Sequence, residues 1–291
     1  MGPWMPKLIR WGLIALGVIL LGVALNTGRQ YLRWSPVTET PAERADRLAG
    51  HWRLVLPDGP GPFPAAILLS GCDGVRDNMD YWAGMFVARG RAALILDSHS
   101  PRSLDDLEAW RLVCAGQALA GAERAGDIAV AMTMLSARDD IVADFVLLGA
   151  SHGGWTAMEF VAETATNELP PGLTDWPAPP ETLLATVSAV VLLYPYCGVL
   201  NGATADRWTG APPTLFVLAE NDTIIDTPDC LARAEGFRKE GASVEIAVLP
   251  GADHGFDQQQ KSLFSTLVFD EGLREETRGI VEGFLGAHGP R

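Results

Sequence analysis

A serine with glycines on both sides is the first residue of this chain that could do chemistry. In the segment GASHGG, Gly149 and Gly153 flank Ser151 at a distance of two residues, which is the G-x-S-x-G pattern of a nucleophile elbow. Such an elbow exposes a serine hydroxyl at a sharp strand-to-helix turn, and side chains at the glycine positions would obstruct that turn. The alternative is a glycine-rich turn in which Ser151 only caps a helix.

A serine hydroxyl is a weak nucleophile at neutral pH and needs a base within hydrogen-bond reach. His254, in the segment GADHGF, follows the last apolar run of the chain and lies where such a base is expected. The other histidines precede the serine, adjoin it or lie near the C-terminus: His51, His99, His152 and His288. We therefore expect His254 to be the base; the alternative is a histidine in a surface loop.

The base in turn needs a carboxylate that holds its ring in the right tautomer. Asp222 lies three residues past the apolar run 214–219, where the chain begins to bend. Its competitors are close in sequence: Glu220, Asp226 and Asp229. Asp222 is preferred, and the resulting order of serine, aspartate and histidine along the chain is the order of the α/β hydrolases.

An oxyanion hole requires two backbone N–H groups aimed at the developing negative charge. The residue after the nucleophile, His152, is expected to supply one of them from its backbone. The backbone of Cys72, in the loop SGCDG after the apolar run 65–70, is expected to supply the other. The alternative is that this loop is an ordinary glycine-rich connection.

Seven apolar runs must carry these residues: 52–57, 65–70, 92–97, 145–150, 188–195, 214–219 and 243–250. Most are continuously apolar, as expected of parallel strands buried on both faces. Helix-like segments lie between them, so we predict an α/β fold with a mostly parallel central sheet and helices on both faces. Active sites of such sheets gather at the carboxyl ends of the strands, which is where the candidate residues fall.

The N-terminal 35 residues read as a targeting segment, followed by a polar linker (36–50) and the catalytic domain (51–291). Residues 11–25 are uncharged and apolar, and reach about 22 Å as a helix, short of a hydrocarbon core of about 30 Å. Aromatic residues at both ends favour an uncleaved anchor over a cleaved signal peptide: Trp4, Trp11, Tyr31 and Trp34. Basic residues before the apolar run favour a cytoplasmic N-terminus and an exported domain.

Composition narrows the function further. The chain has 36 acidic and 22 basic residues and a net charge of −14, which opposes a nucleic-acid partner. We find no P-loop, no dinucleotide glycine motif and no closely spaced cysteine pair, and therefore expect neither a cofactor nor a metal. The oligomeric state is left open.

With these residues assigned, the chain resembles the dienelactone hydrolase family of α/β hydrolases over residues 50–288. The resemblance rests on the combined order of several segments: SGCDG, LDSHSPRS, GAERAGDIAVAM, GASHGG, YPYCG, AENDTIID and GADHGF. It implies hydrolysis of an ester or lactone through an acyl-enzyme, with Ser151, Asp222 and His254 as the triad. Two positions depart from the family: the founding members have a cysteine nucleophile, and Ser70 stands where a His-Gly motif would have histidine.

Three further residues are candidates for contact with the substrate: His99, Arg102 and Trp155. The alternative for His99 and Arg102 is a structural role between loops, and Trp155 is as readily a core residue. The proline-rich segment 165–183 is expected to be a rigid excursion that could cap the acyl pocket, together with Trp155 and Trp208.

Four cysteines allow three pairings, and four buried thiols are the alternative. If the domain is exported, the neighbouring strands that precede them favour Cys72 with Cys114 and Cys197 with Cys230.

The sequence thus predicts a membrane-anchored or secreted serine hydrolase acting on a small ester or lactone. Three alternatives remain: an oligopeptidase-like amidase, an acyltransferase, and a non-catalytic membrane-anchored protein that retains the hydrolase fold.

Overall fold

A seven-stranded sheet forms the centre of the molecule in the computed structural model, which describes residues 7–262 and 265–288. The strands are arranged in the order β1-β3-β2-β4-β5-β6-β7, and all neighbours are parallel except β1 and β3. Their bounds are β1 Arg53–Val55, β2 Phe63–Leu69, β3 Ala92–Leu96, β4 Ile141–Ala150, β5 Val187–Leu193, β6 Thr214–Ala219 and β7 Val244–Leu249. All seven predicted strands are present, and the predicted fold class is confirmed.

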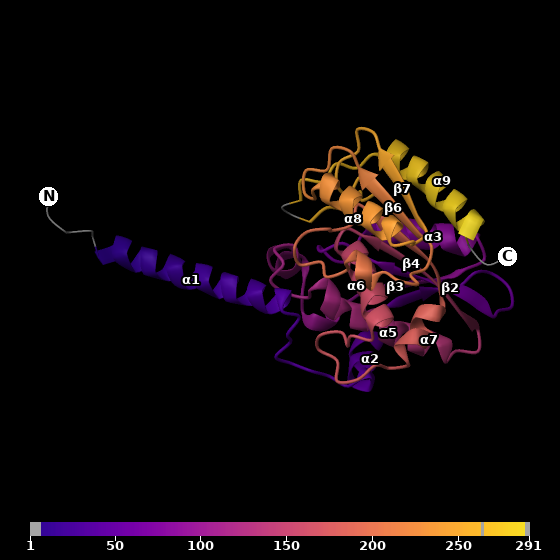
Figure 1. Ribbon diagram of the computed structural model, residues 1–291, viewed down its shortest axis with the longest axis horizontal. Coiled ribbons are helices and arrows are strands. Elements are labelled where there is room, and N and C mark those ends of the chain that lie inside the picture. Colours follow the sequence, from indigo (N-terminus) through magenta and orange to yellow (C-terminus); the bar gives the residue numbers. More distant parts are fainter. Residues whose placement is uncertain (1–6, 263–264, 289–291) are drawn as a thin grey trace.

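Helices cover both faces of the sheet (Figure 1). Successive strand residues point to opposite sides, and the apolar side chains on both sides need cover. On one face, α3 (Asp77–Ala88) and α9 (Glu271–His288) pack on Ala66, Leu68 and their neighbours. On the other face, α5 (Gly121–Ser136), α6 (His152–Thr166) and α8 (Thr227–Lys239) cover Ile67, Leu69 and their neighbours. The shorter helices are α2 Pro41–Ala49, α4 Asp106–Glu108, α7 Pro180–Ala185, the 3₁₀ turns η1 Ser100–Arg102 and η3 Ala205–Arg207, and the π turn η2 Ala109–Val113.

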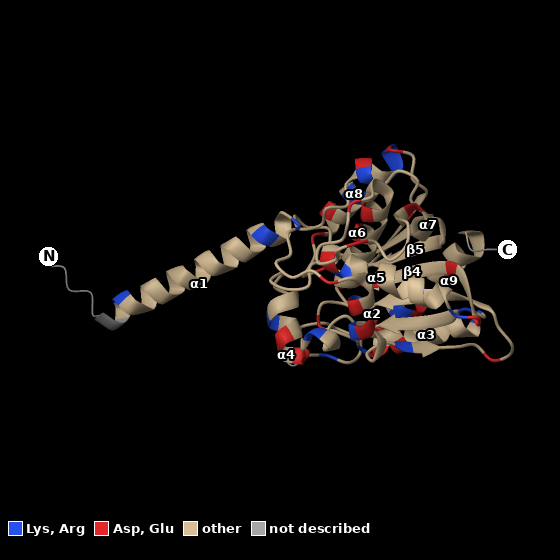
Figure 2. Ribbon diagram, turned by 90° about the horizontal axis from the view of Figure 1, so that it is seen from below, with Lys and Arg blue, Asp and Glu red and all other residues tan. Residues whose placement is uncertain are grey.

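The N-terminal helix α1 (Lys7–Tyr31) projects away from the rest of the molecule (Figure 1). Its segment Ile9–Tyr31 has a mean hydropathy of 1.9, and its most apolar part is not covered by protein, so by length and composition it could cross a membrane. Charged residues colour only the two ends of α1 (Figure 2). Of the expected aromatic belt, Trp11, Tyr31 and Trp34 are exposed, and Trp4 lies outside the described residues.

The segment expected as a linker, residues 36–50, is folded onto the domain and contains α2. A capping box begins this helix: the Thr40 hydroxyl accepts from the Glu43 N–H, and the Glu43 carboxylate accepts from the Thr40 N–H. Arg44 is buried and pairs with Asp127 of α5 over 2.7 Å. The capping residues Thr40 and Glu43 have the sequence spacing of a capping box. The pairing of Arg44 with Asp127, which holds the helix on the domain, is not indicated by any local pattern.

Candidate active site

Ser151 lies between the end of β4 and the start of α6, in the strained geometry of a nucleophile elbow. Its φ of 53° and ψ of −113° fall in a region that L-residues rarely adopt. A Cβ on Gly149 would come within 2.3 Å of the Gly153 backbone, and a Cβ on Gly153 within 2.0 Å of the Leu69 carbonyl oxygen. Both glycines are therefore required by the close approach of the turn to β2 and α6.

The structure brings Ser151, His254 and Asp222 into one hydrogen-bonded row. The His254 Nε2 atom lies 2.9 Å from Ser151 Oγ, and its Nδ1 atom lies 2.7 Å from Asp222 Oδ2. The side chains of His254 and Asp222 are almost fully buried. A carboxylate on Nδ1 favours the tautomer in which Nε2 carries a lone pair toward the serine hydroxyl. The arrangement can therefore remove the serine proton.

Asp222 is held in place by the turn that follows β6. Its Oδ1 atom accepts from the backbone N–H groups of Ile224 (2.9 Å) and Ile225 (2.7 Å), which leaves Oδ2 for His254. The competing carboxylates lie elsewhere: Glu220 accepts from the Gly251 N–H, and Asp226 is the N-terminal flanking residue of α8. The adjacent Asp253 accepts from the N–H groups of Thr223 and His254 and so ties the two loops together.

Both predicted oxyanion donors border the same cavity as Ser151. His152 is the first residue of α6, so its N–H has no acceptor within its own helix. Gly71, the neighbour of Cys72, lies so close to Ser151 that a Cβ placed on it would be 3.9 Å from the serine Cβ. The loop Gly71–Cys72 and the start of α6 thus both adjoin the serine at this cavity, as an oxyanion hole requires.

The side chain of His152 faces away from the hydrogen-bonded row of Ser151, His254 and Asp222. Its Nδ1 atom lies 3.3 Å from Nη1 of the buried Arg124, and its ring packs edge-on against Trp155. Burial and, to a smaller extent, the charge of Arg124 together lower the pKa of His152 to about 3. The ring is therefore neutral at pH 7, and the expectation that only its backbone serves the site is consistent with this position.

A cavity of about 570 Å³ opens in front of Ser151 and His254. Its wall is largely apolar and aromatic, and it includes Trp155, which therefore remains a candidate for contact with the substrate. The Trp155 Nε1 atom donates to Glu159 over 2.8 Å, which fixes the indole in place. Other wall residues come from loops after several strands: Trp110, Val113, Tyr196, Leu200, Ile224 and Leu267.

The other candidates for substrate contact lie outside this cavity. Arg102 donates to both carboxylate oxygens of Asp127 at 2.9 Å, and burial of His99 lowers its pKa well below the usual value. Trp208 stacks on Phe237 in the core. Among the described residues, none of the segment 165–183 lines the cavity. Arg102, His99 and Trp208 therefore have structural surroundings, which corrects their expected role at the pocket.

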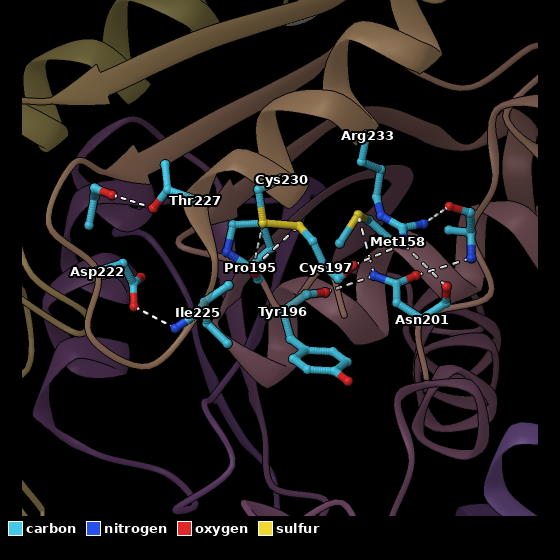
Figure 3. Close-up of a disulfide and its surroundings, with 12 residues drawn as sticks. Met158, Pro195, Tyr196, Cys197, Asn201, Asp222, Ile225, Thr227, Cys230 and Arg233 are labelled. Carbon is cyan, nitrogen blue, oxygen red and sulfur yellow. Dashed lines mark hydrogen bonds between the residues drawn. A yellow bond between two sulfur atoms is a disulfide. The ribbon is translucent and has the colours of Figure 1, made fainter. Parts of the chain in front are cut away.

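Two disulfides stabilise the loops of the site, in the pairing favoured by the sequence. Cys72–Cys114 joins the candidate oxyanion loop to the loop after η2. Cys197–Cys230 joins the loop after β5 to α8, beside the turn that carries Asp222 and Ile225 (Figure 3). The candidate oxyanion loop and the loop after β5, which both contribute to the wall of the cavity, are thus each covalently tied to another part of the domain.

A buried cluster of Tyr194, Asp257 and Trp82 adjoins His254 and was not predicted. The ring of Tyr194 packs edge-on against His254, and its hydroxyl donates to Asp257, which also accepts from Trp82 Nε1 over 2.7 Å. Burial and the neighbouring charge of Asp257 raise the pKa of Tyr194 well above its usual value, so the hydroxyl remains a donor. In the sequence, Tyr194 is part of the apolar run 188–195 and of the segment YPYCG, and neither pattern indicates its contact with His254.

The described residues include no group of histidine, cysteine and carboxylate side chains that could hold a metal ion.

Comparison with known proteins agrees with this architecture. The model of the dienelactone hydrolase family matches residues 181–276, which include Asp222 and His254. No curated protein matches the sequence.

Three solved structures illustrate the likeness of fold. A candidate dienelactone hydrolase from Klebsiella pneumoniae is 17% identical, with a TM-score of 0.61 over 81% of this chain and 92% of its own. Esterase 2 of Thermogutta terrifontis, phosphorylated by paraoxon, is 18% identical, with a TM-score of 0.59 over 82% and 90%. A dienelactone hydrolase-like promiscuous phosphotriesterase from metagenomic libraries is 15% identical, with a TM-score of 0.56 over 81% and 92%. At these identities the likeness shows the fold, which is that of the α/β hydrolases.

Proposed function

We propose that this chain belongs to the dienelactone hydrolase family of α/β hydrolases and is a serine esterase that cleaves an ester or lactone through an acyl-enzyme. The proposal rests on one observation above all: His254 lies between Ser151 Oγ and Asp222 Oδ2, within hydrogen-bond distance of both.

In the proposed reaction, His254 Nε2 takes the Ser151 proton as Oγ attacks the carbonyl carbon of the ester. The negative charge that develops on the carbonyl oxygen is stabilised by the backbone N–H groups of His152 and Cys72. His254 then gives its proton to the leaving alcohol, and the acyl group remains on Ser151. A water molecule, deprotonated by His254, attacks the acyl-enzyme, releases the acid and returns the proton to Ser151.

The composition of the cavity wall favours a substrate whose acyl group is mainly apolar. Apolar and aromatic side chains make up most of its lining, and the guanidinium of the lining residue Arg111 pairs with Glu108 over 2.6 Å. An apolar wall binds an alkyl or aryl group by removing its surface from water. An ester or lactone with such a group is therefore the proposed substrate class.

We further propose that α1 remains attached as a membrane anchor and that the domain is exported. The length and composition of α1 support the anchor. The two disulfides support export, since disulfides persist in oxidising compartments and are rare in the cytosol.

The proposal is tested with the full chain and the variant Ser151→Ala. We expect the unaltered protein to hydrolyse p-nitrophenyl acetate and to be labelled by a fluorophosphonate, and we expect the variant to do neither. Turnover or labelling that persists in the variant would contradict the role of Ser151. Transfer of the acetyl group from p-nitrophenyl acetate to an added alcohol in preference to water would indicate an acyltransferase instead.

A further inference from the structure

We propose that the cavity opens onto the membrane that α1 spans, and that the substrate is an amphiphilic ester whose acyl chain reaches Ser151 from the bilayer. This inference rests on the proposed function, and it names the substrate class and the surface from which that substrate comes.

The end of α1 contacts Gln117, which directly follows a segment that lines the cavity. Asn26 Nδ2 donates to the backbone oxygen of Gln117 over 2.7 Å, and Gln117 Nε2 donates to Thr27 Oγ1 over 3.0 Å. The residues just before Gln117, from Val113 to Gly116, line the cavity. The anchor and the pocket thus share one loop, which the Cys72–Cys114 disulfide joins to the candidate oxyanion loop.

The position of this contact along α1 sets its depth relative to a bilayer. The uncharged apolar run ends at Leu25, and the residue that bonds Gln117 is Asn26. A helix rises about 1.5 Å per residue, so Gln117 meets α1 within a few ångströms of the end of the apolar run. If α1 spans the bilayer, the loop that walls the cavity therefore lies at the membrane–water interface.

A second contact links the anchor segment to the pocket. Arg33, two residues past the end of α1, donates to Glu159 Oε2 over 2.8 Å. The other oxygen of Glu159 accepts from Trp155 Nε1, and Trp155 forms part of the wall of the cavity. This second contact restricts how far the domain can turn about the end of α1.

Several exposed apolar side chains line the cavity or lie within three residues of a lining residue in the chain. We call them the apolar rim: Leu107, Trp110, Val199 and Ile224, which are 51%, 40%, 75% and 54% exposed. They come from loops after β3, β5 and β6, and two of them also line the cavity. Apolar side chains grouped in this way mark a surface that contacts another apolar phase, and tryptophan is enriched at membrane interfaces.

The charge of the chain indicates which bilayer fits the rim. The net charge is −14, and the rim residue Leu107 directly follows Asp105 and Asp106. Anionic lipids would repel this surface, whereas a zwitterionic bilayer offers apolar contact without repulsion. The surface therefore fits a bilayer of phosphatidylcholine type.

The first test measures activity. The full chain in phosphatidylcholine vesicles is given p-nitrophenyl palmitate in the bilayer or p-nitrophenyl acetate in water. We expect the double variant Leu107→Ser, Val199→Ser to lose at least tenfold in palmitate turnover and to keep acetate turnover within twofold.

The matched control is Leu56→Ser, Val142→Ser, which removes exposed apolar side chains at the opposite end of the sheet, where β1 ends and β4 begins. We expect it to change neither rate. Equal loss of palmitate turnover in both double variants, or no loss in the rim variant, would overturn the inference and leave the proposed function intact. Absence of Ser151-dependent hydrolysis of either ester would instead overturn the proposed function.

The second test locates the rim without using activity. All four native cysteines are in disulfides, so one introduced cysteine can be labelled selectively. A fluorophore on Val199→Cys should be quenched by nitroxide-labelled phosphatidylcholine, and the same fluorophore on Val142→Cys should not. Equal quenching at the two positions would show that the rim does not face the bilayer.

Discussion

The carboxylate of Asp222 divides its two oxygens between His254 and the backbone. Oδ2 lies 2.7 Å from His254 Nδ1, while Oδ1 accepts from the N–H groups of Ile224 and Ile225. A carboxylate fixed in this way both orients the imidazole and stabilises the imidazolium that forms when the serine proton is taken.

The first prediction follows from this relationship. Asp222→Asn retains the shape of the turn but can hold His254 in the wrong tautomer, so we expect kcat for p-nitrophenyl acetate to fall by roughly 10²–10⁴. Steady-state kinetics measure the loss, and thermal unfolding checks that the fold remains. Asp226→Asn is the control, because Asp226 lies four residues away at the start of α8. If kcat fell as much in the control as in Asp222→Asn, Asp222 would not be the acid that orients His254.

The second prediction concerns the disulfides, which close segments of 42 and 33 residues. Loop closure on this scale stabilises a domain by about 3–4 kcal/mol. We consider two double variants, one without each disulfide: Cys197→Ser with Cys230→Ser, and Cys72→Ser with Cys114→Ser. We expect both to lower the unfolding free energy by comparable amounts. Only the second pair should also reduce kcat under conditions where both proteins remain folded, because Cys72 belongs to the candidate oxyanion loop. Denaturant unfolding and kinetics separate the two effects, and equal kcat values would argue against Cys72 as a donor.

The third prediction concerns Arg33, whose guanidinium reaches the fully buried carboxylates of Glu159 and Glu163. Burial by itself would lower the pKa of Arg33, but the two carboxylates outweigh it and raise the pKa above its usual value. Arg33→Met leaves buried charges unpaired, and we expect a loss of roughly 3 kcal/mol in unfolding free energy.

The rescue variant Arg33→Met, Glu163→Gln should recover part of this stability, because it removes one of the stranded charges. Arg29→Met is the matched control, since Arg29 donates to Asn26 and to the Trp34 carbonyl, both close to it in the sequence. Denaturant unfolding provides the comparison, and a rescue variant no more stable than Arg33→Met would show that the carboxylates are not the cause.

The fourth prediction concerns pH. Burial lowers the pKa of His152 from 6.5 to about 3, so between these values the unfolded chain binds a proton that the folded chain does not. The free energy of unfolding is therefore not reduced by His152 above pH 6.5, and it decreases as the pH falls from 6.5 toward 3. His152→Asn should reduce the slope of unfolding free energy against pH, between pH 5.5 and 6.5, by up to about 1.4 kcal/mol per pH unit. Urea unfolding at a series of pH values measures it, and an unchanged slope would mean that His152 is protonated when buried.

The local pattern of the sequence was sufficient to predict the strands, the elbow and the order of the candidate residues. Continuous apolar runs identify buried parallel strands because both faces of such strands must be covered. The glycines around Ser151 identify the turn because only glycine permits the approach of Gly153 to Leu69. These features depend on residues close together in the chain.

The tertiary structure decided what depends on distant residues. It brought His254 to Ser151 across 103 residues, and it assigned Arg102 to Asp127 rather than to the cavity. It also folded residues 36–50 onto α5 and joined the end of α1 to the wall of the pocket. No local periodicity records such contacts, because a buried charge or a loop finds its partner only when the whole sheet is assembled.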